Sequence, residues 1–231
     1  MIVDCDVDGF TSSAIIYQYI KSFAPDQEID YWLHEHKQHG LEDHIANILN
    51  CDTHYSLVIL PDSSSNDYEY HEQLKEIGTK CLILDHHDIE ADTKISDNAC
   101  IINNQLSKNY PNKDLTGAGV TWQFCRGYDE IAGISYSKNL IDLAALGVCG
   151  DMGSVLNLEN RYIMLTGFNC VTDYFFLSAI RKQVYSITGK VVAPDKEIME
   201  ALTPIKVAFY IVPMMNAMIR IGTMEEKERL F

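Results

Sequence analysis

Short runs of apolar residues, each followed by acidic residues or histidines, recur through the first hundred positions of the chain. These runs are Met1–Val3, Ile29–Leu33, Leu57–Leu60 and Cys81–Leu84, and segments with helical apolar spacing lie at 10–23, 41–49 and 67–77. Continuous apolar runs that alternate with helices are typical of buried parallel strands. The first half of the chain therefore predicts a parallel β-sheet flanked by helices.

Beyond about residue 105 the apolar spacing becomes helical. Helices are predicted at 117–126, 138–149, 159–181, 195–202 and 223–231, with a break at Gly189–Pro194. We therefore predict one α/β domain over residues 1–231, with the sheet in about 1–105 and a mostly helical part in about 106–231. Residues 117–119 (Gly-Ala-Gly) are expected to start their helix tightly, with their amides near a phosphate.

Side chains that can bind a metal follow three of the predicted strands. Asp4, Asp6 and Asp8 follow the first strand, Asp62 follows the third, and Asp85, His86 and His87 follow the fourth. The carboxyl ends of parallel strands meet at one edge of a sheet, so these side chains are expected to converge there. The first three carboxylates also share one face of an extended segment, because strand side chains alternate with a period of two.

Several carboxylates in one place repel one another unless cations neutralise them, which favours a metal site. Oxygen ligands with one or two imidazoles suit Mn²⁺ or Mg²⁺, and the nitrogen favours Mn²⁺. Two such ions about 3.5–4 Å apart can activate a water and stabilise the leaving oxygen in phosphoester hydrolysis. Each motif alone also fits another structure, because D-x-D-x-D-G occurs in calcium loops and adjacent histidines occur in solvated turns.

Composition narrows the classes of function. The chain has 231 residues, 47% of them hydrophobic, and a formal charge of −15, which argues against a broad electrostatic grip on nucleic acid. Bound divalent ions would, however, supply positive charge at the place where a phosphate must bind. The seven cysteines are scattered without a C-x-x-C pair, as is usual for reduced thiols in the cytoplasm. No run approaches about 18 uninterrupted apolar residues, so no membrane association is expected.

Four segments resemble, in order, the motifs of the DHH phosphoesterase superfamily: DCDVDGFTSSA, LPDSSS, LDHHDIE and GDMGS. Two further segments resemble the RecJ-like single-strand exonuclease branch of that family. They are residues 101–122 and IVPMMNAMIRIGTMEEKERLF, which is similar to the family element P-x-x-N-A-x-x-R-x-G. The resemblance spans nearly the whole chain and implies a DHH-type catalytic core with two Mn²⁺ or Mg²⁺ ions.

The resemblance also implies roles for individual residues. Asp6, Asp8, Asp62, His86 and Asp151 are the implied metal ligands, with Asp62 bridging the two ions. Asp85 would orient the histidine beside it, and His87 would contact the phosphate or act as an acid. His39 lies in a loop similar to one near the family's active site and is a candidate substrate contact.

Asn216 and Arg220 lie four residues apart on a predicted helix face. They form either an exposed surface pair or, as the resemblance implies, a contact with the phosphate backbone, because arginine binds phosphate bidentately. A second candidate cluster contains His34, His36, His39 and His44, which form either a zinc site or a polar loop. The charged run from Glu225 to Arg229 is expected to be a solvated helix face.

The chain departs from the family pattern in two places. Many members carry a histidine where this chain has Ile2, so either Asp4 supplies the missing ligand or one metal site is weakened. Members with exonuclease activity usually continue into a C-terminal substrate-binding domain, which would begin where this chain ends, at Phe231. The sequence is therefore expected to be either a fragment of a longer protein or a minimal core without that domain.

The leading hypothesis is a phosphodiesterase that cleaves single-stranded DNA or short oligonucleotides with a water activated by two metal ions. The charge of −15 leaves room for a smaller substrate, such as a nanoRNA, a cyclic dinucleotide, an adenosine bisphosphate or pyrophosphate. A catalytically silent scaffold related to the family is the third alternative. The retained ligand set argues against the scaffold, and the Ile2 departure favours it weakly.

Overall fold

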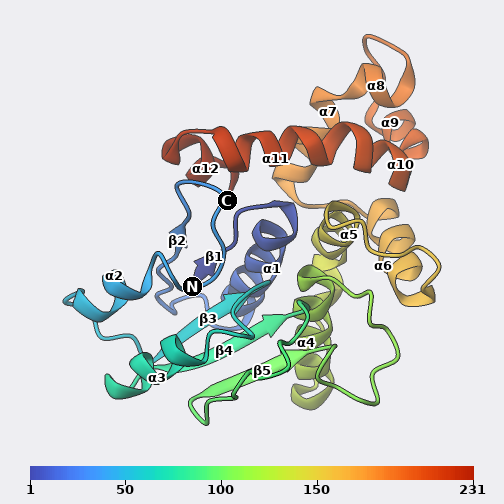
Figure 1. Ribbon diagram of the computed structural model, residues 1–231. Coiled ribbons are helices and arrows are strands. Elements are labelled where there is room, and N and C mark those ends of the chain that lie inside the picture. The colour runs from blue at the N-terminus through green and yellow to red at the C-terminus, as the bar shows by residue number, and fades with distance from the viewer.

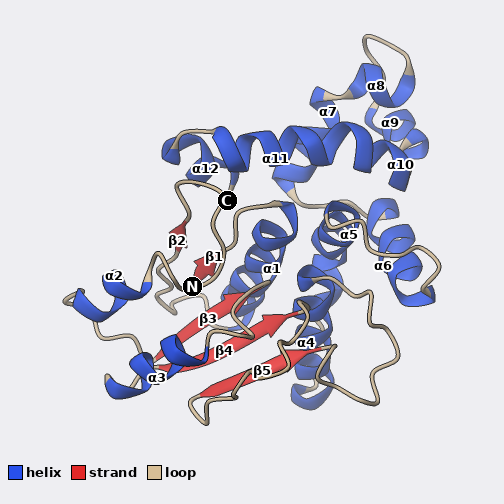
Figure 2. Cartoon of the chain, in the orientation of Figure 1, coloured by secondary structure: helices blue, strands red, loops and turns tan.

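A computed structural model of residues 1–231 places five parallel strands in two neighbouring ladders (Figures 1 and 2). The strands are β1 (Ile2–Val3), β2 (Trp32–Leu33), β3 (Leu57–Pro61), β4 (Lys80–Asp85) and β5 (Ala99–Asn103). The larger ladder has the order β3-β4-β5, and the short pair β1-β2 lies beside β3. All three ladder pairings are parallel, which confirms the predicted parallel sheet.

Helices cover both faces of this sheet. On one face, α2 (Ile45–Asn50) and α3 (Tyr68–Glu76) enclose a small apolar core that includes Val58, Leu60 and Ile83. On the other face, Ile59 and Leu84 join the main core under α1 (Val7–Phe23), α4 (Gly117–Ala132) and α5 (Ile141–Gly150). Alternate residues of β3 therefore point to opposite faces, as a strand buried on both sides requires.

Helices make up the remainder of the chain (Figure 2). After a 3₁₀ turn at Ser137–Leu140, the chain forms α5, α6 (Leu158–Asn169), α7 (Tyr174–Lys182), α8 (Val184–Thr188), α9 (Asp195–Ala201), α10 (Pro204–Lys206), a π-helical turn (Val207–Ile211), α11 (Val212–Ile221) and α12 (Met224–Leu230). In Figure 1, the red helices α11 and α12 cross above α1.

The predicted helix 159–181 is in fact two helices, α6 and α7, that meet at an angle of 79°. The Asp142 carboxylate accepts hydrogen bonds from the backbone amides of Thr172 (2.7 Å) and Asp173 (2.8 Å) at the bend. Asp173 in turn caps α7 by accepting from the amide of Phe176. The apolar spacing hid this break, because polar capping residues interrupt the helix without changing its hydrophobic period.

Strand β5 was not predicted. Its sequence, ACIIN, is too short to distinguish a strand from a helix by periodicity. The strand is only partly buried, and its Cys100 is exposed. The predicted strand Ile29–Leu33 is reduced to the two residues of β2.

The charged run from Glu225 to Arg229 was expected to be a solvated helix face, but one of its residues is buried. Lys227 is buried, and its ammonium group donates to the backbone carbonyls of His34 (2.9 Å) and Glu35 (2.7 Å). A buried ammonium requires acceptors of this kind. The contact joins α12 to the loop that follows β2.

The 18-residue helical stretch Pro204–Ile221 has a mean hydropathy of 1.2, so length and composition alone would allow it to cross a membrane. Its Asn216 and Arg220 instead contact the start of α1. Those contacts favour a position packed on the core.

Candidate metal centre

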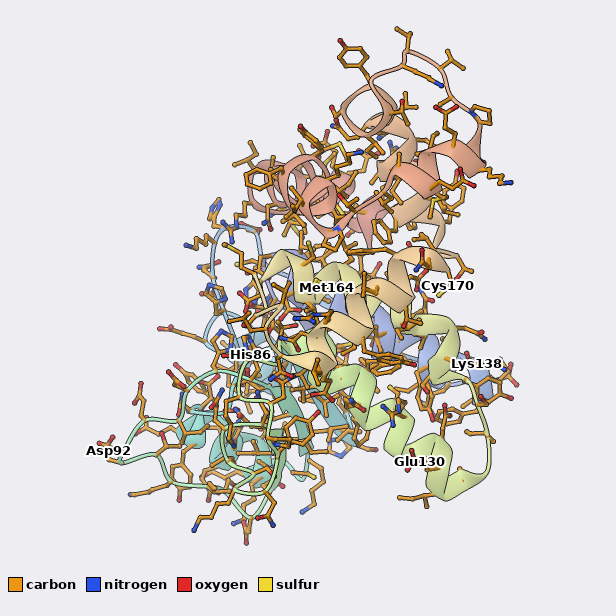
Figure 3. All side chains as sticks on the ribbon, turned by 90° about the vertical axis from the view of Figure 1, so that its right-hand side faces the viewer. His86, Asp92, Glu130, Lys138, Met164 and Cys170 are labelled. Atoms are coloured by element: carbon orange, nitrogen blue, oxygen red, sulfur yellow. The ribbon has the colours of Figure 1, made fainter.

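The predicted metal-binding side chains converge at the carboxyl end of the sheet. They come from the segments after β1, β3 and β4 and from the end of α5. Three groups have ligand atoms that all lie within 4.8 Å of one another: Asp8 with His86 and Asp151, Asp62 with His86 and His87, and Asp4 with Asp6 and Asp62. In Figure 3, His86 lies where the sheet meets the helical half of the chain.

The imidazole of His86 lies among three carboxylates. Its Nε2 is 3.2 Å from Asp62 Oδ1, 3.8 Å from Asp151 Oδ2 and 3.9 Å from Asp8 Oδ2. One nitrogen facing several carboxylate oxygens at these separations is the donor arrangement that a divalent ion such as Mn²⁺ requires.

Two helix N-termini hold the first carboxylates in place. Asp6 is the N-cap of α1, and its Oδ1 accepts from the amides of Asp8 (3.0 Å) and Gly9 (3.2 Å). Asp8 accepts from the Thr116 hydroxyl (2.9 Å) and from the amide of Gly117 (2.7 Å) at the start of α4. Amides and the positive ends of helices stabilise carboxylates in such positions. The amides of this Gly-Ala-Gly segment therefore bind a carboxylate of the protein, not the phosphate that the sequence suggested.

Asp62 has an unusual backbone conformation and an unpaired oxygen. Its φ is 66°, in the left-handed region, which is uncommon for residues other than glycine and concentrates at functional sites. The residue is buried, and its Oδ1 has no hydrogen-bond partner, as is also true of Asp4 Oδ1. Buried carboxylate oxygens are costly without a donor or a cation, so these atoms fit a metal ion.

Burial also changes the proton affinity of the carboxylates. Burial, opposed in part by His86, raises the pKa of Asp8 to about 6. Burial and then the charge of Asp8 raise the pKa of Asp62 well above its usual range. Burial likewise raises the pKa of Asp151. A bound cation would favour the charged forms of all three groups.

His87 is held differently from its neighbour. Its Nδ1 lies 2.8 Å from Asp85 Oδ1, and Asp85 also accepts from the amides of His86 (2.7 Å) and Ser65 (3.0 Å). The hydrogen bond to Asp85 raises the pKa of His87 to about 9. Although burial opposes ionisation of Asp85, the hydrogen bonds from His87 and Ser65 hold its pKa below the usual range. His87 is therefore a cation at neutral pH. Asp85 binds the ring of His87 and only the backbone amide of His86, whereas the sequence expected it to orient the ring of the adjacent histidine.

The three predicted substrate contacts also lie at this centre. Asn216 Oδ1 accepts from the amide of Val7 (3.1 Å), and Arg220 Nη2 is 3.6 Å from Asp6 Oδ2. Both residues therefore contact the start of α1, and their contact with a phosphate backbone stays a prediction. His39 Nδ1 lies 2.6 Å from Asp4 Oδ2.

A family model for the DHH family, N-terminal domain, matches residues 1–148. The chain belongs to the DHH family. The sequence motifs therefore identified the family correctly.

Relatives with longer chains share this DHH core. The chain is 38% identical over 229 residues to YorK of Bacillus subtilis strain 168, provisionally named an SPbeta prophage-derived single-strand DNA-specific exonuclease; the match covers 99% of this chain and 36% of YorK. It is 27% identical over 168 residues to the single-stranded-DNA-specific exonuclease RecJ of the same strain, covering 71% of this chain and 20% of RecJ.

The fold is also that of a solved RecJ structure. The crystal structure of RecJ in complex with Mn²⁺ from Thermus thermophilus matches with a TM-score of 0.74 at 20% identity, covering 99% of this chain and 31% of that chain. The match confirms the predicted fold class. The chain spans about a third or less of the length of these relatives.

The structure locates Ile2, and it adds Asn103, which the sequence did not single out. Ile2, which stands where many members carry a histidine, is fully buried in the small core beneath the site. Asn103 at the end of β5 donates to Ser65 Oγ (2.9 Å) and to the His87 carbonyl (3.0 Å) and so fixes the loop that carries the histidines. A polar residue that ends a strand was the available signal for Asn103, but it required β5 to be predicted first.

Proposed function

We propose that this chain is the catalytic core of a metal-dependent phosphodiesterase that hydrolyses single-stranded DNA or short oligonucleotides. The observation that carries the proposal is the convergence of His86 with Asp8, Asp62 and Asp151 beside the cationic His87. The names of YorK and RecJ, both single-strand DNA-specific exonucleases, support the choice of substrate.

The donor set would hold two divalent ions, Mn²⁺ or Mg²⁺. One set of donors is Asp8, His86 and Asp151, with Asp62 beside His86, and the other is Asp4, Asp6 and Asp62. Asp62 lies at both sets, which supports its assignment as the bridging ligand. When bound, such ions act as Lewis acids on a phosphoryl oxygen and lower the pKa of water. The manganese in the similar RecJ structure supports this choice of metal.

The other residues of the site would bind and orient the substrate. His87, protonated and fixed by Asp85, can donate a hydrogen bond to a phosphate oxygen or a proton to the leaving oxygen. Arg220 brings a second positive charge to the edge of the centre, beside Asp6. Asn216 binds the first amide of α1 and so fixes the helix that carries Asp8.

Hydrolysis of a small phosphate compound is the second candidate function. The formal charge of −15 leaves few cations to follow a long phosphate backbone away from the centre. A dinucleotide or pyrophosphate needs contacts only at the centre itself. We further propose a cytoplasmic location, which the seven free cysteines support.

The proposal is tested by Mn²⁺-dependent digestion of end-labelled single-stranded DNA beside a dinucleotide and pyrophosphate. We expect the DNA to be cleaved, and we expect Asp62→Ala to abolish both cleavage and Mn²⁺ binding. Asp52→Ala changes an exposed carboxylate outside the centre and is the matched control. Cleavage of only the small compounds would favour the second function. Mn²⁺ binding without any cleavage would favour a silent scaffold, and full activity of Asp62→Ala would overturn the site.

A further inference from the structure

A second group of potential ligands lies beside the metal centre and has a different chemistry. Atoms of Asp4, Cys5 and His39 all lie within 4.8 Å of one another. Asp4 and Cys5 are buried, and His39 is half exposed. The group therefore combines a carboxylate, a thiol and an imidazole, whereas the neighbouring centre is dominated by carboxylate oxygens.

The buried ring of His34 lies beside Asp4, one member of this group. Its side chain is fully enclosed, and neither ring nitrogen has a hydrogen-bond partner. Nε2 lies 4.0 Å from Asp4 Oδ1, another buried atom without a partner. These two buried atoms are too far apart to form a hydrogen bond with each other. Leaving them unpaired costs free energy, and an ion bound to both would remove that cost.

We propose that Asp4, Cys5 and His39 form a zinc site next to the candidate metal centre, and that His34, whose ring lies beside Asp4, supplies the fourth ligand after a shift of its ring. Zn²⁺ prefers four ligands drawn from cysteine, histidine and carboxylate side chains, whereas Mg²⁺ and Mn²⁺ favour oxygen. Binding deprotonates the Cys5 thiol and removes the proton shared between His39 and Asp4, and both protons pass to solvent. No oxidant or other reactant is required.

The surroundings of His34 fix the segment that carries it. Lys227 holds the backbone by donating to the His34 and Glu35 carbonyls. Asp43 Oδ2 lies 3.6 Å from His34 Nδ1, on the side of the ring away from the nitrogen nearest Asp4. At this separation Asp43 makes no hydrogen bond to the ring, but it places a negative charge behind the imidazole.

This site goes beyond the proposed hydrolysis and does not depend on it. Asp4 is shared, because its carboxylate also groups with Asp6 and Asp62. Zinc bound through Asp4 would withdraw that carboxylate from the neighbouring centre. We therefore also expect Zn²⁺ to inhibit the proposed activity, because the ion bound by Asp4, Asp6 and Asp62 would lose one ligand.

Titration of the full chain with Co²⁺, a spectroscopic substitute for Zn²⁺, tests the site. A cobalt ion bound to a thiolate has a near-ultraviolet charge-transfer band that oxygen and nitrogen ligands do not produce. We expect this band to reach saturation and to disappear on addition of Zn²⁺. Cys5→Ser is expected to lose the band, and His34→Gln to weaken cobalt binding by about tenfold or more. Cys81→Ser changes a buried thiol outside the group and is expected to keep the band.

Asp62→Ala separates this site from the hydrolytic one. We expect that variant to keep the charge-transfer band while losing Mn²⁺-dependent cleavage, so either proposal can fail without the other. Absence of the band in the wild-type chain, or its persistence in Cys5→Ser, would refute the zinc site. Loss of the band in Asp62→Ala would also refute it as a site separate from the metal centre. Circular dichroism of each variant checks that the fold is kept.

Discussion

Adjacent residues His86 and His87 have opposite surroundings at the level of single side chains. The Nε2 of His86 faces three carboxylates, whereas His87 is bound to Asp85 and carries a proton. His86 is therefore suited to bind a metal cation, and His87 is suited to contact an anion such as a phosphate. Sequence alone distinguishes the two only through the family resemblance, because two neighbouring histidines after a strand look alike.

Substitution of each histidine is therefore expected to have a different effect. His87→Ala is predicted to slow cleavage by about 10²–10⁴-fold, the usual contribution of a positioned acid or base, while Mn²⁺ binding stays within a few-fold of wild type. His86→Ala is predicted to lose Mn²⁺ binding, because it removes the imidazole that faces Asp8, Asp62 and Asp151 together. Isothermal titration with Mn²⁺, followed by single-turnover cleavage, measures both effects. Equal loss of metal in the two variants would contradict the separation of roles.

The start of α4 is the element that constrains the centre most tightly. A methyl group at Gly117 would lie 2.6 Å from Asp62 Cβ, and its amide binds Asp8. Gly127 lies in the same helix, and a methyl group there would meet nothing within 4 Å. A side chain at Gly117 would therefore push against the metal centre, whereas one at Gly127 would not touch it.

This contrast gives a matched pair of variants. Gly117→Ala is predicted to reduce Mn²⁺ affinity at least tenfold, because Asp62 must move away from the helix. Gly127→Ala is predicted to leave the affinity unchanged and to stabilise the fold by up to about 1 kcal/mol through helix propensity. Calorimetric Mn²⁺ binding and urea unfolding test the pair. Unchanged metal affinity in Gly117→Ala would show that the close approach to Asp62 does not matter.

Asp129 connects three elements through one carboxylate. It accepts from the Tyr19 hydroxyl of α1 (2.7 Å) and from the amide of Ser137 (2.8 Å), which begins the 3₁₀ turn after α4. Burial opposes its ionisation, but the hydrogen bonds from Ser137 and Tyr19 lower its pKa. An acid whose pKa is lower in the folded state stabilises the fold above its unfolded pKa, and this contribution is lost as the pH falls through the folded pKa.

Asp129→Asn is therefore expected to destabilise the protein in a pH-dependent way. The expected loss at pH 7 is about 2 kcal/mol, typical of hydrogen bonds to a charged group. The difference from wild type is expected to shrink as the pH falls below about 4, where the carboxyl group is protonated in the unfolded chain. Urea unfolding at several pH values measures this trend, and a constant difference across that range would disprove the charge-based explanation.

At the scale of the whole molecule, the sequence pattern predicted those strands and helices that short stretches of sequence define. The strands that precede Asp62 and His86 could be located, because each is an apolar run followed by polar residues. Most helices could be located from their apolar spacing. The partners of Asp8 could not, because Thr116 and Gly117 are 108 and 109 residues away in sequence. The burial of His34 was also invisible, since a loop rich in histidine has no apolar period and is enclosed only by distant elements.

Lys227 shows the same dependence on distant contacts and can be tested. Lys227→Ala leaves two carbonyls of the loop after β2 without their donor, and we expect a loss of about 2–3 kcal/mol in unfolding free energy. Lys196→Ala removes an exposed lysine of α9 and is expected to change stability by less than about 0.5 kcal/mol. Equilibrium unfolding in urea compares the two. A small effect of Lys227→Ala would mean that water satisfies the carbonyls equally well.

The hydrogen bond between Val7 and Asn216 joins positions 209 residues apart in sequence. A nascent chain emerging from the ribosome therefore carries the acidic end of α1 long before α11 is made. During that interval the carboxylates have neither Asn216 nor Arg220 beside them. The contacts around the start of α1 are therefore completed only after α11 has been synthesised.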